Sequence, residues 1–140
     1  PQIRGYAKAY PLICFLRKVA YKNKNKGETK LENMFEIAGT TLKIKMPEDV
    51  DHPVSDHVKK ETDRIMDLTY IRTMIFDFAD TEFMDSSGIG LIMGRYRTLG
   101  MRQGCVKAEN VNPHIDKLLH LSGVHRYMEI RKAVEEGSTK

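Results

Sequence analysis

Three polar residues, Asp85, Ser86 and Ser87, separate two apolar runs in the middle of the chain. The first run ends at Met84 and reads as a buried strand, and the second begins after Gly88 and reads as a helix. A carboxylate and two hydroxyl groups between such elements can cap the helix, act in nucleophilic catalysis, or accept a phosphoryl group.

Helix capping is the simplest of these roles. Ser and Asp are among the residues found most often at helix N-caps, where a side-chain oxygen accepts a hydrogen bond from a free backbone N–H group. Ser86 lies just after the predicted strand and just before the predicted helix. In this interpretation the loop has a structural role only.

Nucleophilic catalysis fits the sequence poorly. A serine hydrolase elbow has the pattern Gly-x-Ser-x-Gly, whereas Gly88 and Gly90 both follow the serines. A phospho-aspartate receiver also fits poorly, because Asp49 and Asp51 precede a helix and Lys107 lies in the middle of a strand. The histidines read as loop or surface-helix residues without an obvious role as a base: His52, His57, His114, His120 and His125. We therefore expect that the protein is not an enzyme.

Phosphorylation is the third role for these hydroxyl groups. A phosphoryl group adds about −1.5 to −2 charges at neutral pH. The backbone N–H groups at the start of a helix tolerate such a charge within the domain. A docked partner that presents acidic or apolar groups would not tolerate it, so the modification would act as a switch on binding.

The helix that follows the serines has an unusual outer face. With about 3.6 residues per turn, one side carries Ile89, Ile92, Tyr96 and Leu99, and the opposite, outward side carries Ser87, Leu91, Gly94 and Thr98. Leu91 is flanked by Gly90 and Gly94, which makes a low-relief strip that a partner's backbone can approach closely. Arg95 and Arg97 lie beside this strip. The alternative is that the two glycines allow close packing within the domain.

The preceding sequence predicts the elements that lead to this loop. Residues 34–46 read as two short strands around a turn at Gly39, and residues 47–53 as a loop. Asp51 or His52 can cap the next helix, and Pro53 suits its first turn. Residues 74–79 are apolar on both faces except at Asp77, which is typical of a central parallel strand covered by helices.

The sequence after the serine loop completes the domain. We expect a strand at residues 104–108, a helix that Asn112 caps and Gly123 ends, a strand at residues 124–130 and a short helix at residues 132–136. The order β-β-α-β-α-β-α-β-α predicts a single α/β domain, in which helices pack on a mixed, mainly parallel β-sheet.

The basic charge of the chain is concentrated at its N-terminus. Residues 1–30 hold eight Lys or Arg and one acidic residue, whereas the remaining 110 residues hold 15 basic and 18 acidic groups. The formal net charge of +4 therefore gives little support for nucleic acid as a partner of the domain. We expect residues 1–33 to be a basic leader, disordered or not part of the natural domain, and residues 34–140 to form the domain.

The leader and the cysteines indicate a cytoplasmic protein. The apolar run at residues 10–16 is too short to span a bilayer, and no signal-peptide cleavage site follows it. Cys14 and Cys105 cannot build a disulfide framework and show no metal-ligand spacing. We therefore expect no membrane partner and no bound metal.

The stretch FMDSSGIGLIMGRYRTLG at residues 83–100 closely resembles the signature of the anti-anti-sigma factors of the STAS-domain family (sulfate transporter and anti-sigma antagonist). Its GRYR is more similar to the sporulation sigma-F branch than to the general-stress branch. The resemblance extends to VDH at residues 50–52 and to NPHIDKLLHLSGVHRYMEI at residues 112–130, and covers roughly residues 35–136. Glu48 replaces a common glycine, Pro53 a usual non-proline, and the leader has no counterpart.

This resemblance implies a protein-binding switch. The unphosphorylated protein would bind an anti-sigma factor that is also a serine kinase, and so release the sigma factor for transcription. The kinase would use its own ATP and Mg²⁺ to phosphorylate Ser86, which ends the interaction, and a PP2C-type phosphatase would reset the switch. The domain itself would need no cofactor.

The resemblance also implies roles by position. Ser86 is the acceptor, Asp85 and Ser87 shape its loop, and Asp51 lies beside it on the partner-facing surface. The docking helix contributes Gly88, Leu91, Gly94 and Arg95, and the helix projection adds Gly90.

Two alternatives stay open. A small nucleotide- or anion-binding regulatory protein, using the helix N-terminus after Asp85, would bind its ligand tightly without a protein partner. A STAS domain that serves a transporter fits less well, because the sequence shows no membrane span.

Overall fold

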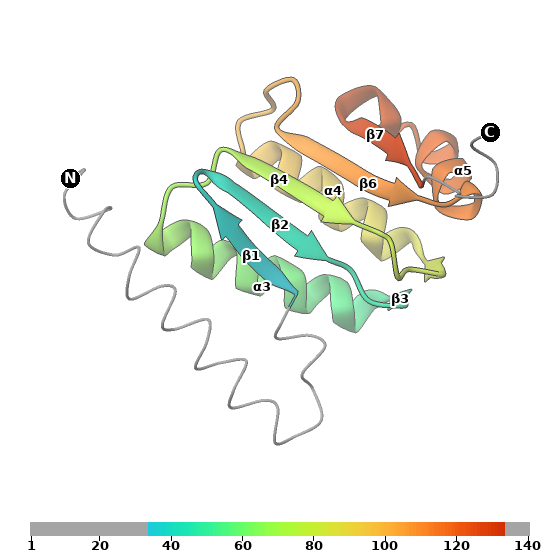
Figure 1. Cartoon of the computed structure of the whole chain (residues 1–140), viewed down its shortest axis with the longest axis horizontal. Helices are drawn as coiled ribbons and strands as arrows, with labels where there is room; N and C mark the ends of the chain where they lie inside the picture. The colour runs from blue at the N-terminus through green and yellow to red at the C-terminus, as the bar shows by residue number, and fades with distance from the viewer. Residues whose placement is uncertain (1–33, 134–140) are drawn as a thin grey trace, which may run out of the picture.

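Five strands form the main sheet of the domain in the computed structural model, which describes residues 34–133 (Figure 1). Their order across the sheet is β1 (Phe35–Ala38), β2 (Thr41–Lys45), β4 (Thr73–Asp77), β6 (Val106–Val111) and β7 (Glu129–Lys132). β1 runs antiparallel to β2, and every other pair is parallel. The predicted mixed, mainly parallel sheet is therefore confirmed. The predicted leader lies outside the described residues.

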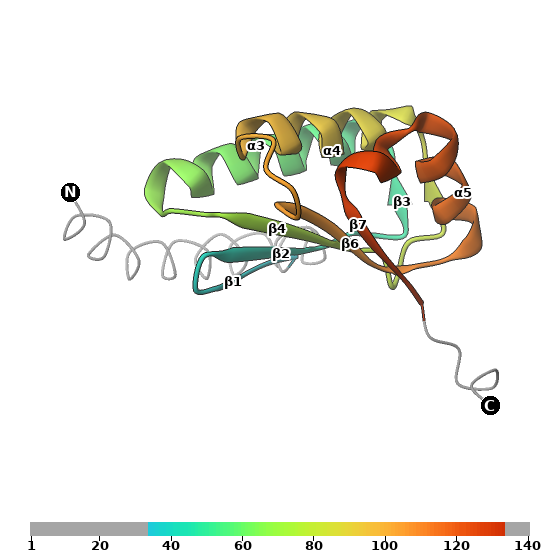
Figure 2. The same ribbon diagram turned by 90° about the horizontal axis from the view of Figure 1, so that it is seen from above.

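Three helices pack on one face of this sheet (Figure 2). They are α3 (His52–Leu68), α4 (Ser86–Thr98) and α5 (Pro113–Ser122). The side chains beneath them are apolar and fully buried, as Ile44 of β2 and Phe76 of β4 show. Alternate residues of the strands point to the opposite face, where Ile75 is only partly buried. The prediction that helices cover β4 therefore holds for one face only.

Asp77 lies on this opposite face of β4 and is nevertheless buried. Its Oδ1 accepts hydrogen bonds from the backbone N–H of Ala79 at 3.0 Å and from Nδ2 of Asn110 at 2.8 Å. Lys43 approaches its Oδ2 at 3.9 Å. These contacts explain how a central strand accommodates a carboxylate, because a buried charge must be hydrogen-bonded or paired.

The first turn and the first helix begin as predicted. Gly39 adopts φ 65° between β1 and β2, a conformation that glycine adopts without strain. Asp51, rather than His52, is the N-cap of α3, and its Oδ1 accepts a hydrogen bond from the backbone N–H of Val54 at 3.2 Å. Pro53 occupies the first turn of the helix, where its missing N–H costs nothing.

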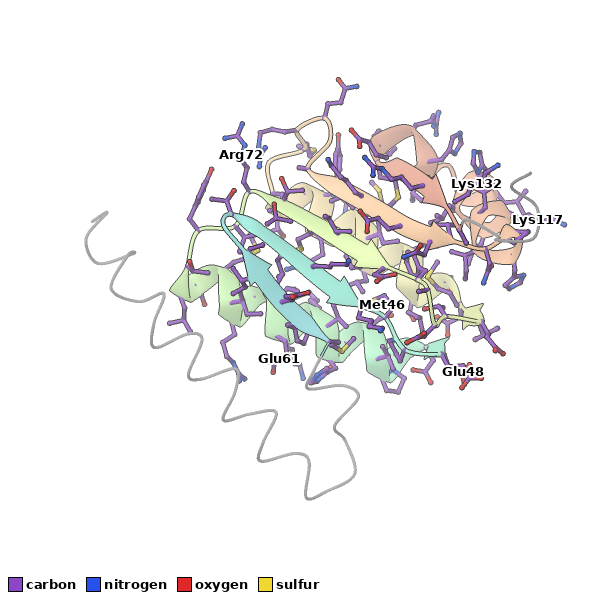
Figure 3. The ribbon with its side chains drawn as sticks, in the orientation of Figure 1. Met46, Glu48, Glu61, Arg72, Lys117 and Lys132 are labelled. Atoms are coloured by element: carbon purple, nitrogen blue, oxygen red, sulfur yellow. The ribbon has the colours of Figure 1, made fainter. Side chains whose placement is uncertain are left out.

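A second, two-stranded sheet was not predicted. β3 (Asp49–Val50) lies within the residues expected to form a loop, and it pairs in parallel with β5 (Phe83–Met84). The backbone oxygen of Glu48, which Figure 3 labels beside this sheet, accepts hydrogen bonds from the N–H groups of Glu82 at 2.8 Å and Phe83 at 3.0 Å. The serine loop therefore follows β5 of the small sheet and not a strand of the main sheet, which corrects the sequence interpretation.

The C-terminal elements are shifted relative to the prediction. β6 runs to Val111, which is three residues beyond its predicted end. Gly123, at φ 87°, ends α5 as expected, but the chain then forms the short 3₁₀ helix η1 (Val124–Tyr127) before β7. Lys132, which Figure 3 labels, was predicted to begin a helix but belongs to β7. Its Nζ lies 3.6 Å from Oδ2 of Asp116. Residues 134–136 of that predicted helix lie outside the described residues.

Candidate functional site

Asp85 is the N-cap of α4, and its backbone is extended at φ −100° and ψ −172°. Its Oδ1 accepts a hydrogen bond from the backbone N–H of Ser87 at 2.8 Å and a second, short one from Ser87 Oγ. The hydrogen bonds from Ser87, the side-chain one first, hold the pKa of the Asp85 carboxyl below its usual value of 3.8. Asp85 is therefore a carboxylate at neutral pH.

The two serines differ in their surroundings. Ser86 is exposed, and within residues 34–133 its side chain makes no hydrogen bond. Ser87 is half-buried, and its Oγ lies between the Asp85 carboxylate and Ser55 Oγ, which is 3.1 Å away. Of these two hydroxyl groups, only that of Ser86 is exposed and makes no hydrogen bond within residues 34–133.

The small sheet brings the starts of α3 and α4 together. Val50 and Met84 are partners in β3 and β5, so the next residues, Asp51 and Asp85, are neighbours. The backbone N–H of Asp85 donates to the oxygen of Val50 at 3.1 Å. Asp51 thus lies beside the serine loop, as the family resemblance implied, and each of the two carboxylates caps a helix.

A groove with a volume of about 260 Å³ runs between α3 and α4, next to the serine loop. From α3 it is lined by His52, Ser55, Asp56 and Lys59, and from α4 by Ser87, Gly90, Leu91, Gly94 and Arg95. The structure therefore brings together five of the residues predicted for partner binding. Gly88 is not among them.

The helix projection predicted that Leu91 lies on an exposed outer face, but the structure places it elsewhere. It is 6% exposed and lines the groove between the two helices. The projection was wrong on this residue because it did not include α3, which packs along the same side of α4. Ile92 and Leu99 are buried as predicted, and Thr98 is exposed.

The glycines of α4 separate into two kinds. A Cβ atom at Gly88 would lie 2.5 Å from Cγ and from Sδ of the buried Met84, so close packing within the domain requires this glycine. A Cβ atom at Gly90 or at Gly94 would meet nothing within 4 Å. The alternative that these two glycines serve internal packing is therefore wrong, and both open onto the groove.

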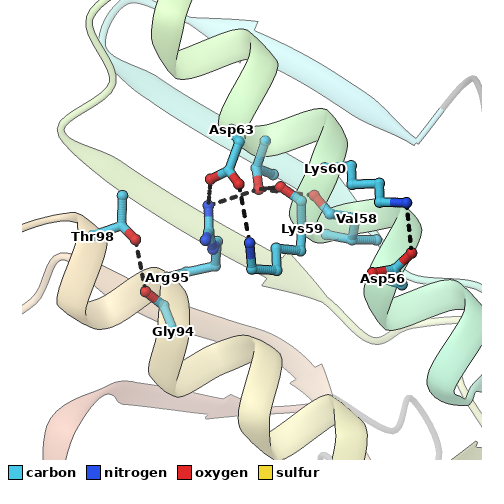
Figure 4. Close-up of polar contacts among 9 residues, drawn as sticks. Asp56, Val58, Lys59, Lys60, Asp63, Gly94, Arg95 and Thr98 are labelled. Atoms are coloured by element: carbon cyan, nitrogen blue, oxygen red, sulfur yellow. Dashed lines mark hydrogen bonds and ion pairs between the residues drawn. The ribbon is translucent and has the colours of Figure 1, made fainter.

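Arg95 links α4 to α3 (Figure 4). It is 3% exposed, and its Nη1 donates hydrogen bonds to Asp63 Oδ1 at 2.6 Å and to Thr62 Oγ1 at 3.1 Å. Lys59 Nζ donates to the other carboxylate oxygen of Asp63 at 3.2 Å. Burial raises the pKa of Asp63, but the hydrogen bonds and charges of Arg95 and Lys59 outweigh this and lower it below 3.8. Arg95 thus forms part of the groove wall and holds α4 against α3.

Ser55, Thr62 and Asp63 were not identified as site residues from the sequence. Ser55 and Thr62 occupy helical positions on the same side as Val58 and Ile65, so their polarity on a buried face was a usable signal. Their partners lie more than 30 residues away in the sequence, and local patterns do not reveal such pairs.

Within residues 34–133, no group of three or more His, Cys, Asp or Glu side chains is placed to hold a metal ion. In the same range no hydrogen bond joins a histidine to Ser86 or Ser87. None of the helices in this part of the chain has the length and apolar character that crossing a bilayer requires.

The fold and the matched residues define the class of protein. The STAS domain family matches residues 33–137, which is most of the chain. The chain belongs to the STAS domain family, and two of its curated relatives are anti-sigma F factor antagonists. It is 32% identical over 89 residues to the anti-sigma F factor antagonist of Paenibacillus polymyxa, a match that covers 64% of this chain and 76% of that protein.

Solved structures agree with this assignment. The unphosphorylated form of the anti-sigma factor antagonist SpoIIAA has a TM-score of 0.62 and 28% sequence identity, over 74% of this chain and 90% of that one. The phosphorylated form of SpoIIAA, a Bacillus cell fate determinant, has a TM-score of 0.57 and 28% identity, over 74% and 93% of the two chains.

Proposed function

We propose that the unphosphorylated protein binds an anti-sigma factor with serine kinase activity and so frees a sigma factor for transcription. Phosphorylation of Ser86 by that kinase, with the kinase's own ATP and Mg²⁺, ends the interaction. A PP2C-type phosphatase removes the phosphoryl group. The cycle takes place in the cytoplasm, and the similarity to anti-sigma F factor antagonists supports a role in sporulation.

The free hydroxyl of Ser86 is the observation that carries this proposal. Phosphoryl transfer requires an acceptor oxygen that reaches the γ-phosphorus and a proton that is free to leave. Ser86 Oγ is exposed and unbonded within the described residues, whereas Ser87 Oγ is held by Asp85 and Ser55. The phosphorylated form of the similar SpoIIAA supports the same chemistry.

The charge of the phosphoryl group explains the switch. Asp85 stays ionised because its pKa is lowered by Ser87, so a phosphoryl group on Ser86 would add about two negative charges next to an existing one. A partner that covers this position would bury those charges without a counter-ion. Leaving a buried charge unpaired costs on the order of 3–5 kcal/mol, which corresponds to an affinity loss of about a hundredfold to several thousandfold.

The groove supports a docking role for α4. Glycine in the interior of a helix destabilises it by roughly 1 kcal/mol relative to alanine. Gly90 and Gly94 are not required by packing within the domain. Their presence beside Leu91 is explained if the partner approaches the helix backbone closely along the groove.

The alternative of a small nucleotide or anion ligand receives less support from the site. The N-terminus of α4 is already occupied by the Asp85 carboxylate, which accepts the N–H of Ser87. A free anion would have to displace this negatively charged group.

Incubation with the cognate anti-sigma kinase and ATP, followed by phosphosite mapping and a pull-down, tests the proposal. We expect phosphate on Ser86, retention of the unmodified protein by the kinase, and release of the modified protein. Ser86→Ala should bind but resist phosphorylation. Phosphate on Ser87 in place of Ser86, or equal retention of both forms, would contradict the proposal.

A further inference from the structure

We propose that Ser55 of α3 is a positioning residue that directs phosphorylation to Ser86 by holding the neighbouring Ser87 hydroxyl inside the groove. This inference rests on the proposed function, because it concerns the choice between two adjacent acceptors for the same kinase. It assigns a role to a residue of α3 that the sequence signature does not include.

A chain of hydrogen bonds carries the inference. Ser55 is buried, at 6% exposure, and its Oγ lies 3.1 Å from Ser87 Oγ. Ser87 Oγ donates its proton to Asp85 Oδ1, so the hydroxyl that can donate at the other contact is that of Ser55. Ser55 therefore donates to Ser87, and Ser87 donates to Asp85.

This chain makes the Ser87 hydroxyl less available as an acceptor than that of Ser86. In phosphoryl transfer, a bond forms between the serine oxygen and the γ-phosphorus of a nucleoside triphosphate. The bond from that phosphorus to the bridging oxygen breaks, a nucleoside diphosphate leaves, and the hydroxyl proton passes to a base of the kinase. The hydroxyl proton of Ser87 points to Asp85, and a lone pair on Ser87 Oγ accepts a hydrogen bond from Ser55. Attack by the Ser87 oxygen would therefore disrupt two hydrogen bonds, whereas the Ser86 side chain makes none within the described residues.

The product at Ser87 would also be disfavoured. Ser87 lines the groove together with Leu91 and Ser55, so a phosphoryl group there would enter a narrow space beside an apolar side chain. It would also replace a hydrogen bond to Asp85 by repulsion between two anions. Ser86, one residue earlier, is exposed and has none of these restraints.

Ser55 has a distinct part in this arrangement because it belongs to another element. Asp85 and Ser87 both lie at the start of α4, so the hydrogen bond between them is local. Ser55 lies on α3, whose start is fixed by its own cap at Asp51, so its hydroxyl ties Ser87 to the body of the domain. Removal of the Ser55 hydroxyl leaves Ser87 Oγ bonded only to Asp85, two residues before it in the chain.

Phosphorylation of Ser87 in a background without the preferred acceptor tests this role. The full chain with Ser86→Ala is compared with Ser55→Ala/Ser86→Ala, each incubated with the cognate kinase and ATP, and phosphate on Ser87 is quantified by mass spectrometry. We expect the double variant to be modified about threefold to tenfold faster, which is the range for loss of one hydrogen bond. Ser55→Thr/Ser86→Ala, which restores a hydroxyl, should return the rate to that of Ser86→Ala.

The controls separate this role from a structural one and from the proposed function. Thermal unfolding shows whether each variant is folded, and Ser55→Cys, which keeps the size but weakens the hydrogen bond, replaces Ser55→Ala if the latter unfolds. Equal rates on Ser87 in the single and double variants, with wild-type protein still modified on Ser86, would overturn the inference and leave the proposed function intact. Wild-type protein modified on neither serine would overturn both.

Discussion

Asp85 caps α4, and Ser86 and Ser87 differ in whether their hydroxyl groups are engaged by this cap. The N-cap geometry directs the Asp85 side chain to the N–H and hydroxyl of Ser87, the second residue of α4, and leaves Ser86, the first residue, facing solvent. Capping and phosphorylation are therefore not competing interpretations of this loop. Because Asp85 supplies the cap, neither serine hydroxyl is needed for it.

The Ser87→Ala substitution tests this division at the scale of one residue. It removes the side-chain hydrogen bond that is the largest cause of the lowered Asp85 pKa, so we expect this pKa to rise toward 3.8. Titration of the Asp85 carboxyl by NMR measures the change. Ser87→Thr, which keeps the hydroxyl, serves as the matched control, and an unchanged pKa in Ser87→Ala would show that the hydroxyl does not stabilise the carboxylate.

At the scale of the element, the two kinds of glycine in α4 make opposite predictions. Gly94→Ala should raise the free energy of unfolding by up to about 1 kcal/mol, because a helix favours alanine and nothing lies within 4 Å of the new Cβ. The same substitution should weaken binding of the anti-sigma partner, since the added methyl group occupies the groove. Denaturant unfolding and calorimetric binding measure the two effects.

Gly88→Ala is the matched control in the same helix. Its Cβ would lie 2.5 Å from the buried Met84 side chain, so we expect a loss of about 1–3 kcal/mol in the free energy of unfolding. A Gly94→Ala protein that is more stable and binds its partner as tightly as wild type would contradict the docking role of the groove.

The link between α3 and α4 predicts a pH dependence. The pKa of Asp63 is lowered in the folded protein, so its ion pair stabilises the fold above the unfolded-state pKa, near 3.8, and this contribution is lost as the pH falls through the folded value. Asp63→Asn should therefore lower the unfolding temperature at pH 7. Below pH 4, the unfolding temperature of this variant should fall less steeply with pH than that of the wild-type protein. Thermal unfolding between pH 2 and pH 7 tests this. An identical pH profile in both proteins would show that the pair is energetically silent.

Local signals predicted the elements better than the contacts between them. The Asp51–Pro53 sequence and Gly123 carry their own capping chemistry, so the start of α3 and the end of α5 were predictable. β3 and β5 have two residues each, too few for a periodic pattern. The burial of Leu91 and the pairs Ser55–Ser87 and Asp63–Arg95 depend on how α3 packs against α4, which no local pattern contains.

At the scale of the whole molecule, the small sheet determines where the site forms. The pairing of β3 with β5 brings the starts of α3 and α4 together, and the groove lies between these two helices. Both helices lie on the covered face of the main sheet (Figures 1 and 2). Ser86 and both capping carboxylates consequently lie together at the starts of α3 and α4, beside the groove. A partner docked along the groove would therefore lie next to Ser86.

The affinity of the protein for its cognate anti-sigma kinase, measured by calorimetry with and without phosphate on Ser86, tests the central claim most directly. Ser86→Asp and Ser86→Ala provide charged and neutral controls. The account predicts tight binding by the wild-type and Ser86→Ala proteins, and at least about a hundredfold weaker binding by the phosphorylated protein, with Ser86→Asp weakened in the same direction. Equal affinity of the phosphorylated and unphosphorylated proteins would contradict it.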